Sequence, residues 1–165
     1  MIHQFFKYSV NLDFYPCSQE IPQEIIPYEK RLEGSLLTEI KRFQNELHWD
    51  EMWTIPEVYD RLEQGYKFWV LKPKNQIKGW TWLAPDGEIK NVYVSKWLRK
   101  QGWGRKLVEC CCQSALDQEF SQVYARVDIW NRASIYLFEN LLKCAGQAGC
   151  KTHVKLVEEE YGNSK

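Results

Sequence analysis

The feature of this sequence that most limits its possible folds is a pair of closely spaced glycines between two different periodic patterns. Residues 88–94 alternate like a strand, and residues 105–116 carry apolar side chains at helical spacing. Gly102 and Gly104 lie in the short connection between them. Glycine lets a backbone approach an anion closely, and the first N–H groups of a helix have no partner inside it. This order therefore predicts a loop that can bind a pyrophosphate.

Two common phosphate-binding loops do not fit these glycines. A dinucleotide-binding fingerprint needs a third glycine at position 107, where this chain has Leu107. A P-loop needs lysine and then serine or threonine after its last glycine, whereas Gly104 is followed by Arg105 and Lys106. Taken alone, the two glycines could also form a tight turn that binds nothing.

The first third of the chain predicts one strand and two helices. Residues 3–10 read as a strand, and irregular chain follows up to residue 34. The apolar residues of the first helix share one face: Leu36, Leu37, Ile40, Phe43 and Leu47. Thr54, followed by Pro56 and Glu57, predicts the start of a second helix, which ends at Gly65.

The remaining two thirds predict further strands and helices in one packed unit. Three strands over residues 67–72, 77–83 and 88–94 read as a meander, and a helix over 105–116 follows. A strand over 122–128, a helix over 133–142 and a last strand over 150–158 complete the order. We expect an α+β (mixed α/β) fold in a single domain, residues 1–165, in which residues 1–34 are an irregular N-terminal extension apart from their strand.

Charge and hydropathy exclude several classes of partner. The 22 Lys and Arg residues balance the 22 Asp and Glu residues, so no global field attracts nucleic acid. No apolar run approaches the roughly 20 residues that a membrane-spanning helix needs, and the N-terminus does not resemble a signal peptide. The sequence therefore predicts a cytoplasmic protein with neither nucleic acid nor membrane as a partner.

The six cysteines predict packing rather than metal binding. They lie at positions 17, 110, 111, 112, 144 and 150, and these spacings do not match a zinc-binding pattern. Adjacent cysteines rarely bond to one another because the ring would be strained. We expect reduced thiols that pack as small apolar side chains, and no metal site.

Two segments resemble a known superfamily. Residues 99–104 (RKQGWG) are similar to the R/Q-x-x-G-x-G/A signature of the GNAT N-acetyltransferases, and residues 131–138 (NRASIYLF) resemble their N-x-x-A-i-x-L-Y segment. The predicted order of elements is also similar, and the resemblance covers roughly residues 68–142. It implies the GNAT fold, a mixed central sheet flanked by helices. Here the C-terminal strand pair is shortened, because the tail has room for about one strand.

The resemblance implies acetyl-CoA as the cofactor. Its pantetheine arm would enter between the fourth and fifth strands and pair with the fourth, while the glycine loop would hold the diphosphate of coenzyme A. The implied cofactor-binding residues are Val92, Tyr93, Val94, Arg99, Lys100, Gln101, Gly102, Trp103, Gly104, Arg105 and Asn131.

The resemblance also implies direct attack of a primary amine on the thioester. Glu88 precedes Val94 by six residues, an offset at which several GNAT branches carry their catalytic base, although it could equally be a solvated carboxylate at a strand start. Phe138 stands where the superfamily often has a tyrosine that protonates the leaving thiolate. The thiolate would then leave unassisted or with water as the acid, or catalysis would be weakened.

The acceptor is implied only as a small-molecule or peptide amine. Residues 48–53 are aromatic and acidic, and Trp80 and Trp82 share a strand face; they predict either a pocket for a cationic or aromatic amine or ordinary packing. Other interpretations stay open: a module that binds acyl-CoA with little turnover, or transfer of a longer acyl group or onto oxygen. The shortened C-terminus predicts a sheet edge that is covered by a partner chain, as in a homodimer, or by the N-terminal segment.

Overall fold

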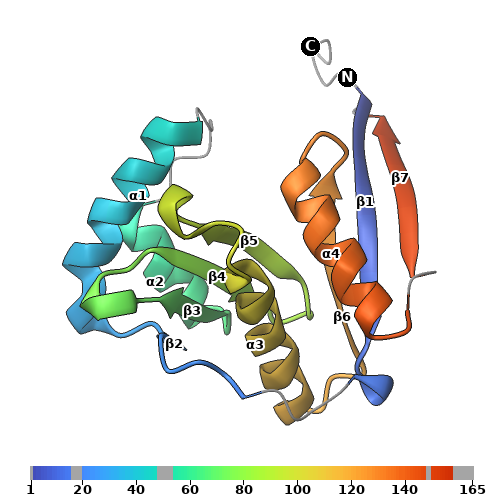
Figure 1. Cartoon of the computed structure of the whole chain (residues 1–165), viewed down its shortest axis with the longest axis horizontal. Coiled ribbons are helices and arrows are strands. Elements are labelled where there is room, and N and C mark those ends of the chain that lie inside the picture. The colour runs from blue at the N-terminus through green and yellow to red at the C-terminus, as the bar shows by residue number, and fades with distance from the viewer. Residues whose placement is uncertain (1, 16–19, 48–53, 148–149, 158–165) are drawn as a thin grey trace, which may run out of the picture.

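The computed structural model describes residues 2–15, 20–47, 54–147 and 150–157. Seven strands and four α-helices lie in these ranges, and Figure 1 shows their arrangement. In chain order they are β1 (Ile2–Asn11), β2 (Ile25–Pro27), α1 (Glu33–Leu47), α2 (Ile55–Glu63), β3 (Lys67–Leu71), β4 (Gly79–Leu83), β5 (Ile89–Val94), α3 (Trp103–Asp117), β6 (Gln122–Asp128), α4 (Arg132–Cys144) and β7 (Lys151–Val157).

The elements agree closely with the periodic patterns of the sequence. Every predicted helix and strand is confirmed to within a few residues, and β6 has the predicted bounds. The side chain of Thr54 accepts a hydrogen bond from the backbone N–H of Glu57, which confirms the predicted helix cap. Two details were predicted wrongly. The short strand β2 lies in a stretch that predicts irregular chain, and Leu37 is exposed rather than part of the buried face of α1.

The strands form two antiparallel sheets that meet at one point. One sheet has the order β2-β3-β4-β5, and the other has the order β6-β1-β7. The strands β5 and β6 run parallel where the sheets meet, and within the described ranges a single bridge, between Glu88 and Tyr124, joins them. There the N–H of Tyr124 donates to the carbonyl of Gly87 at 3.1 Å. Beyond this bridge the facing edges of β5 and β6 carry no ladder in the described part of the chain.

The N-terminal strand β1 lies in the middle of the second sheet. It pairs with β6 from Phe5 opposite Asp128 to Asn11 opposite Gln122, and with β7 on its other side. The shortened C-terminus predicts an uncovered sheet edge, and the sequence leaves open whether a partner chain or the N-terminal segment covers it. The structure shows that the N-terminal segment, as β1, covers β6. The single strand after α4 is also as predicted. A homodimer stays a prediction.

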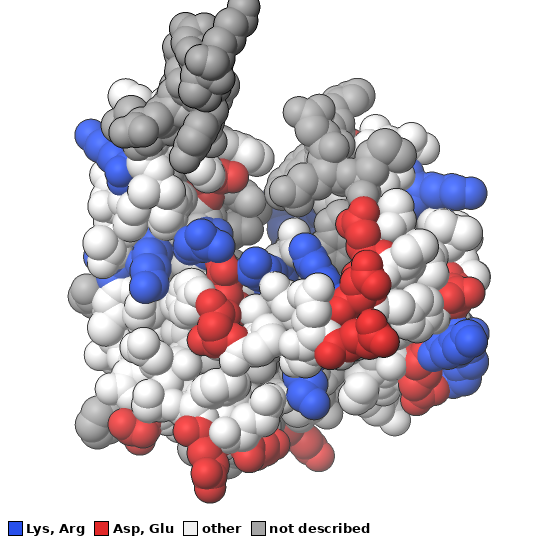
Figure 2. All heavy atoms as spheres, turned by 180° about the vertical axis from the view of Figure 1, so that it is seen from behind, with Lys and Arg blue, Asp and Glu red and all other residues white. Residues whose placement is uncertain are grey.

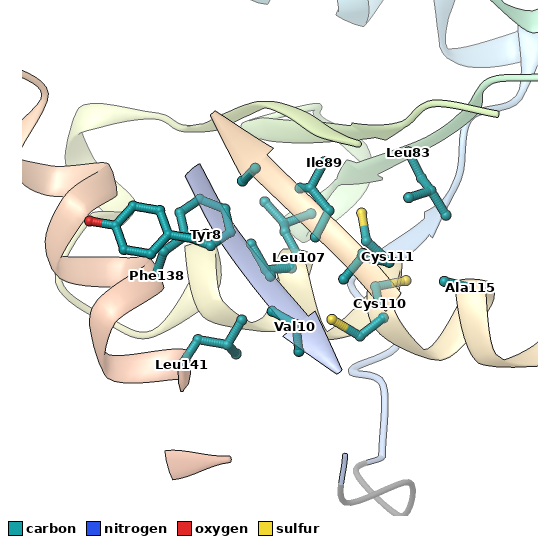
Figure 3. Packing of buried hydrophobic residues seen from close by; sticks show 14 of the residues in the cluster. Tyr8, Val10, Leu83, Ile89, Leu107, Cys110, Cys111, Ala115, Phe138 and Leu141 are labelled. Carbon is teal, nitrogen blue, oxygen red and sulfur yellow. The ribbon is translucent and has the colours of Figure 1, made fainter. Parts of the chain in front are cut away.

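A first apolar core lies between α3, α4 and the second sheet. Val10 of β1 and Leu107 of α3 are buried in it, together with Leu141 of α4 (Figure 3). Val123, Ala125 and Val127 of β6 point into the same core, so the residues that alternate with them face the other side of the sheet. The helices α3 and α4 therefore cover one face at the junction of β5 and β6.

A second core fixes α1 and α2 on the first sheet. Trp82 stacks on Phe68 with their ring centroids 3.9 Å apart, and Trp80 packs beside Phe43 and Tyr93. Both tryptophans are buried. The interpretation of Trp80 and Trp82 as packing residues is therefore confirmed, and the interpretation as pocket walls is wrong.

The cysteines in the described ranges are reduced thiols. Cys110, Cys111 and Cys112 are buried in α3, and burial raises the pKa of the Cys110 and Cys112 thiols to about 12. Cys144 and Cys150 are exposed, so the predicted packing role holds only for the three in α3. Cys17 lies outside the described residues. In the part of the chain that the structure describes, no group of metal-ligating side chains could hold an ion, and no helix has the length and apolarity of a membrane span.

Candidate active site

Beyond the bridge that joins β5 and β6, their facing edges are not paired over the residues that the structure describes, and we call the space between them the gap. A β-bulge distorts β5 beside this gap. Trp80 of β4 lies opposite Tyr93 and Trp82 lies opposite Lys90, so β5 contains one more residue than β4 between these pairs. Asn91 takes up the extra length with a φ of 55°, a conformation that is rare outside glycine. Bulges and such strained residues are common beside active sites, because they redirect neighbouring groups.

Beyond the bulge, β4 and β5 come unusually close together. A Cβ atom placed on Gly79 would lie 2.6 Å from the backbone carbonyl oxygen of Tyr93, a distance that real Cβ atoms do not reach. Glycine at this position is what allows the two strands to pair up to Val94, opposite Gly79.

The gap-facing edge of β5 carries the backbone groups of Val92 and Val94. The N–H of Ser95 donates to the carbonyl of Lys78 at 2.7 Å, so Ser95 faces β4. Because successive backbone amides of a strand point to opposite edges, those of Val94 point toward β6. The carbonyl of Val94 accepts a hydrogen bond of 2.8 Å from Nε of Arg99, which folds the start of the glycine loop back onto the strand.

The glycine loop is open at the start of α3. Gly102 is the N-cap with a φ of 85°, and a Cβ there would meet no atom within 4 Å. No side chain of the described residues caps α3, and the N–H of Lys106 makes the first backbone bond, to the carbonyl of Gly102. The N–H groups of Trp103, Gly104 and Arg105 therefore lack intrahelical acceptors at the positive end of the helix dipole.

The cationic side chains of this loop are mostly engaged with the protein itself. Arg99 lies 3.5 Å from a carboxylate oxygen of Glu46 on α1. Arg105 donates from Nε to Glu109 at 3.0 Å and from Nη1 to the sulfur of Cys144 at 3.5 Å. The side chain of Arg105 thus runs along α3 toward α4, which leaves its backbone N–H as its contribution to an anion site.

Three elements converge at Gly104. A Cβ there would lie 3.7 Å from Cδ2 of Leu137 on α4 and 4.0 Å from Cγ1 of Val92 on β5, both ordinary contact distances. Asn131 begins α4 just after β6 ends, and its side-chain oxygen accepts a 3.2 Å hydrogen bond from the N–H of Ser134. The structure therefore places Gly104 of the loop against Val92 of β5 and Leu137 within α4, while Asn131 caps the start of that helix.

Phe138 is part of the core. It is buried and stacks on Tyr8 of β1, with ring centroids 5.7 Å apart and planes at 19° (Figure 3). The hydroxyl of Tyr8 donates a hydrogen bond of 3.4 Å to Glu139, and burial raises the pKa of Tyr8. Sequence reasoning missed this partner because β1 and α4 are far apart along the chain.

Glu88 lies at the closed end of the gap. It is 4% exposed, and its two carboxylate oxygens accept hydrogen bonds of 2.8 Å from Nε and Nη2 of Arg126 on β6. Lys90 Nζ is 3.5 Å from one of these oxygens. Both carboxylate oxygens of Glu88 are therefore engaged by cationic side chains.

A groove of about 550 Å³ opens beside Glu88, on the face of the sheet away from α3 and α4. Its lining residues come from β1, β5, β6, β7 and the turn before β5: Phe5, Lys7, Asp86, Glu88, Lys90, Tyr124, Arg126 and Val154. Figure 2 views this face and shows a hollow between the two halves of the molecule, with a row of Lys and Arg side chains below it. The acidic and aromatic segment 48–53, a predicted pocket wall, lies outside the described residues.

Comparisons with known proteins give a family and a fold. The model of the acetyltransferase (GNAT) family matches residues 35–143. A search of curated proteins finds no significant match. Among solved structures, an acetyltransferase of the GNAT family from Staphylococcus aureus has a TM-score of 0.61 and 20% identity, covering 70% of this chain and 80% of its own.

Two other solved structures extend this likeness. A ribosomal-protein-alanine N-acetyltransferase from Brucella melitensis has a TM-score of 0.57 and 21% identity, covering 70% of this chain and 81% of its own. A Drosophila protein has a TM-score of 0.66 and 15% identity, covering 95% of this chain. The present chain spans 52% of the length of that Drosophila protein. At these identities the likeness concerns the fold.

Proposed function

Because the chain belongs to the GNAT acetyltransferase family, we propose that it transfers an acetyl group from acetyl-CoA to a primary amine by direct attack. One observation carries the proposal. The facing edges of β5 and β6 diverge beyond the Glu88–Tyr124 bridge, and the gap ends at the uncapped start of α3. An extended thioester arm and a diphosphate need these two features side by side.

The residues around the gap fit coenzyme A in a specific order. Val92 and Val94 offer backbone groups to the pantetheine arm in the manner of an added strand, with Tyr93 between them. The backbone N–H groups of residues 99–105 hold the diphosphate. Asn131 lies beside the thioester end. When bound, acetyl-CoA supplies the activated acetyl group.

Glu88 is the proposed base. A lysine-like amine has a pKa near 10.4 and must lose a proton before it attacks, and a positioned base typically adds about 10² to 10⁴ in rate. Glu88 performs this step. Phe138 has no proton to give and is packed against Tyr8, so the departing thiolate takes its proton from water.

The test measures binding and turnover separately. Calorimetric titration with acetyl-CoA reports cofactor binding, and thiol release across a panel of primary amines reports transfer. We expect micromolar binding, turnover with at least one amine, and a rate at least 100-fold lower for Glu88→Gln with unchanged acetyl-CoA affinity. No binding of any coenzyme A thioester would overturn the proposal.

A second function is favoured by the engagement of Glu88 and by Phe138. The chain would bind acyl-CoA with little turnover and act as a sensor or interaction module. Binding of acetyl-CoA without transfer to any amine supports this function over the first. Mass spectrometry of ligand that copurifies with the protein identifies the acyl group, and a longer chain than acetyl would place the protein among transferases of longer acyl groups.

A further inference from the structure

Two cations lie directly opposite each other in the groove beside Glu88. Lys7 of β1 and Arg126 of β6 are cross-strand partners, and both line the groove. Like charges in directly opposed positions of an antiparallel pair destabilise it unless a negative group lies between or beside them. Lys90 of β5 contributes a third positive charge to the same groove.

The two carboxylates of the groove do not neutralise all three cations. Glu88 binds Arg126 and lies beside Lys90. Asp86 accepts hydrogen bonds from the Tyr124 hydroxyl and from the Glu88 backbone N–H. Nζ of Lys7 instead lies 4.8 Å from the centroid of the Tyr124 ring, and among the residues of known placement no carboxylate comes within ion-pair distance of it.

The groove adjoins the bulge in β5. Two of its cations lie just beyond the bridge between Glu88 and Tyr124, because Lys90 follows Glu88 by two residues and Arg126 follows Tyr124 by two residues. Val92 follows Lys90 by two residues, across the bulge at Asn91. The helices α3 and α4 fill the opposite face of the sheet, so an acceptor can reach the gap only from the face that carries the groove. If its amine enters the gap beside Val92, the remainder of the acceptor lies over the groove.

We propose that this groove is the acceptor subsite, and that Lys7 and Arg126 bind a carboxylate or phosphate group carried by the acceptor amine. The inference rests on the proposed acetyl transfer, since it assigns the substrate class of the same site. Lys7 and Phe5 belong to β1, outside the residues 35–143 that match the family model, so the N-terminal strand adds a binding residue to the site that the family model does not cover. Lys7 is a binding residue here and takes no part in proton transfer.

The experiment compares amines that differ only in charge. One pair is 4-aminobutanoate and 4-aminobutanamide, and the other is phosphoethanolamine and ethanolamine, so the two arms separate carboxylate from phosphate. Each is assayed for kcat/KM by thiol release from acetyl-CoA. Each is also assayed for stabilisation of the coenzyme A complex in thermal unfolding, a measurement that needs no turnover.

The variants isolate the charge of Lys7. Lys7→Met removes the charge and keeps an unbranched apolar side chain, and Lys7→Arg restores the charge. Lys155→Met is the matched control, because Lys155 is exposed on β7 and its neighbour Val154 lines the groove, so Lys155 points to the other face. We expect one charged amine to exceed its neutral counterpart at least tenfold in the wild type and in Lys155→Met. That preference falls at least tenfold in Lys7→Met and returns in Lys7→Arg.

The outcomes separate this inference from the proposed function. If acetyl-CoA binds and the neutral amines match or exceed the charged ones, or if Lys7→Met retains the preference, the inference is overturned while acetyl transfer stands. If no amine turns over, a thermal shift by the charged amine that depends on Lys7 still supports the groove, and its absence overturns it. Failure of acetyl-CoA itself to bind contradicts the proposed function instead.

Discussion

Replacing Tyr8 by alanine tests whether the N-terminal strand is an integral part of the sheet. Tyr8 is fully buried, stacks on Phe138 of α4 and lies in a strand that pairs on both sides. If β1 were instead a loosely attached extension, its side chains would contribute little to the free energy of unfolding. The substitution therefore distinguishes an inserted strand from an appended one.

The size of the effect follows from what the substitution removes. Truncation of a fully buried aromatic ring to alanine costs about 3–5 kcal/mol, which combines lost apolar burial with the cavity left behind. For a domain of 150–250 residues, each kcal/mol lowers Tm by about 2–4 °C. We therefore expect Tyr8→Ala to unfold at least about 6 °C below the wild type.

Urea unfolding and differential scanning calorimetry measure this change. The matched control is Tyr8→Phe, which keeps the ring and removes only the 3.4 Å hydrogen bond to Glu139, so it costs no more than about 1 kcal/mol. A Tyr8→Ala protein as stable as Tyr8→Phe would refute the placement of β1 between β6 and β7. A large loss in both variants would show that the hydrogen bond, rather than the stacking, holds the strand.

Three further predictions concern other parts of the fold. Gly79→Ala should destabilise the protein by about 1–3 kcal/mol in chemical unfolding, because its Cβ would meet a backbone carbonyl of β5 at 2.6 Å. The control is Gly34→Ala in α1, whose Cβ would meet no atom within 4 Å, and this variant should be neutral or stabilising. The buried cysteines at positions 110–112 should resist alkylation at pH 8 until the protein unfolds, and mass spectrometry that finds them modified in the native protein would contradict their placement. The hydrogen bond from the Tyr124 hydroxyl lowers the pKa of Asp86, so it stabilises the fold above the unfolded pKa near 3.9. This contribution is lost as the pH falls through the lowered pKa of the folded state. Tyr124→Phe should cost less than about 1 kcal/mol at pH 7, since Asp86 is exposed, and less still in acid; a cost that does not fall with pH would argue against this bond.

The sequence alone predicts the local elements because their causes are local. Helical and strand periodicity, the cap at Thr54 and the glycines at 102 and 104 each act within a few residues, and the structure confirms the elements they predict. The short strand β2 is missed because three residues ending in Pro27 carry no period. Leu37 is misassigned because helical spacing places it beside the apolar face without deciding which neighbours cover it.

Long-range pairing is what the sequence could not reveal. The pattern of residues 3–10 predicts a strand, but nothing in it names β6 and β7 as its partners. The bidentate pair of Glu88 and Arg126 joins residues 38 apart, and the groove around Lys7 gathers residues from both ends of the chain. The predicted residues of β5 and the glycine loop, by contrast, all lie within residues 92–105, so their relative positions follow from one strand, one loop and one helix.

Binding of the coenzyme A diphosphate at the start of α3 is tested by acetyl-CoA titration of two isosteric variants, Gly104→Asp and Gly104→Asn. A Cβ at Gly104 would make only ordinary contacts, and the two side chains have the same size, so any packing effect is common to both variants. A negative charge in the first turn of a helix interacts favourably with the helix dipole, so the aspartate variant should be no less stable than the asparagine variant in calorimetry. If the diphosphate binds the N–H groups at the start of α3, the aspartate variant should lose at least 100-fold in affinity and clearly more than the asparagine variant. Equal affinity of the two variants and the wild type for acetyl-CoA would contradict the account.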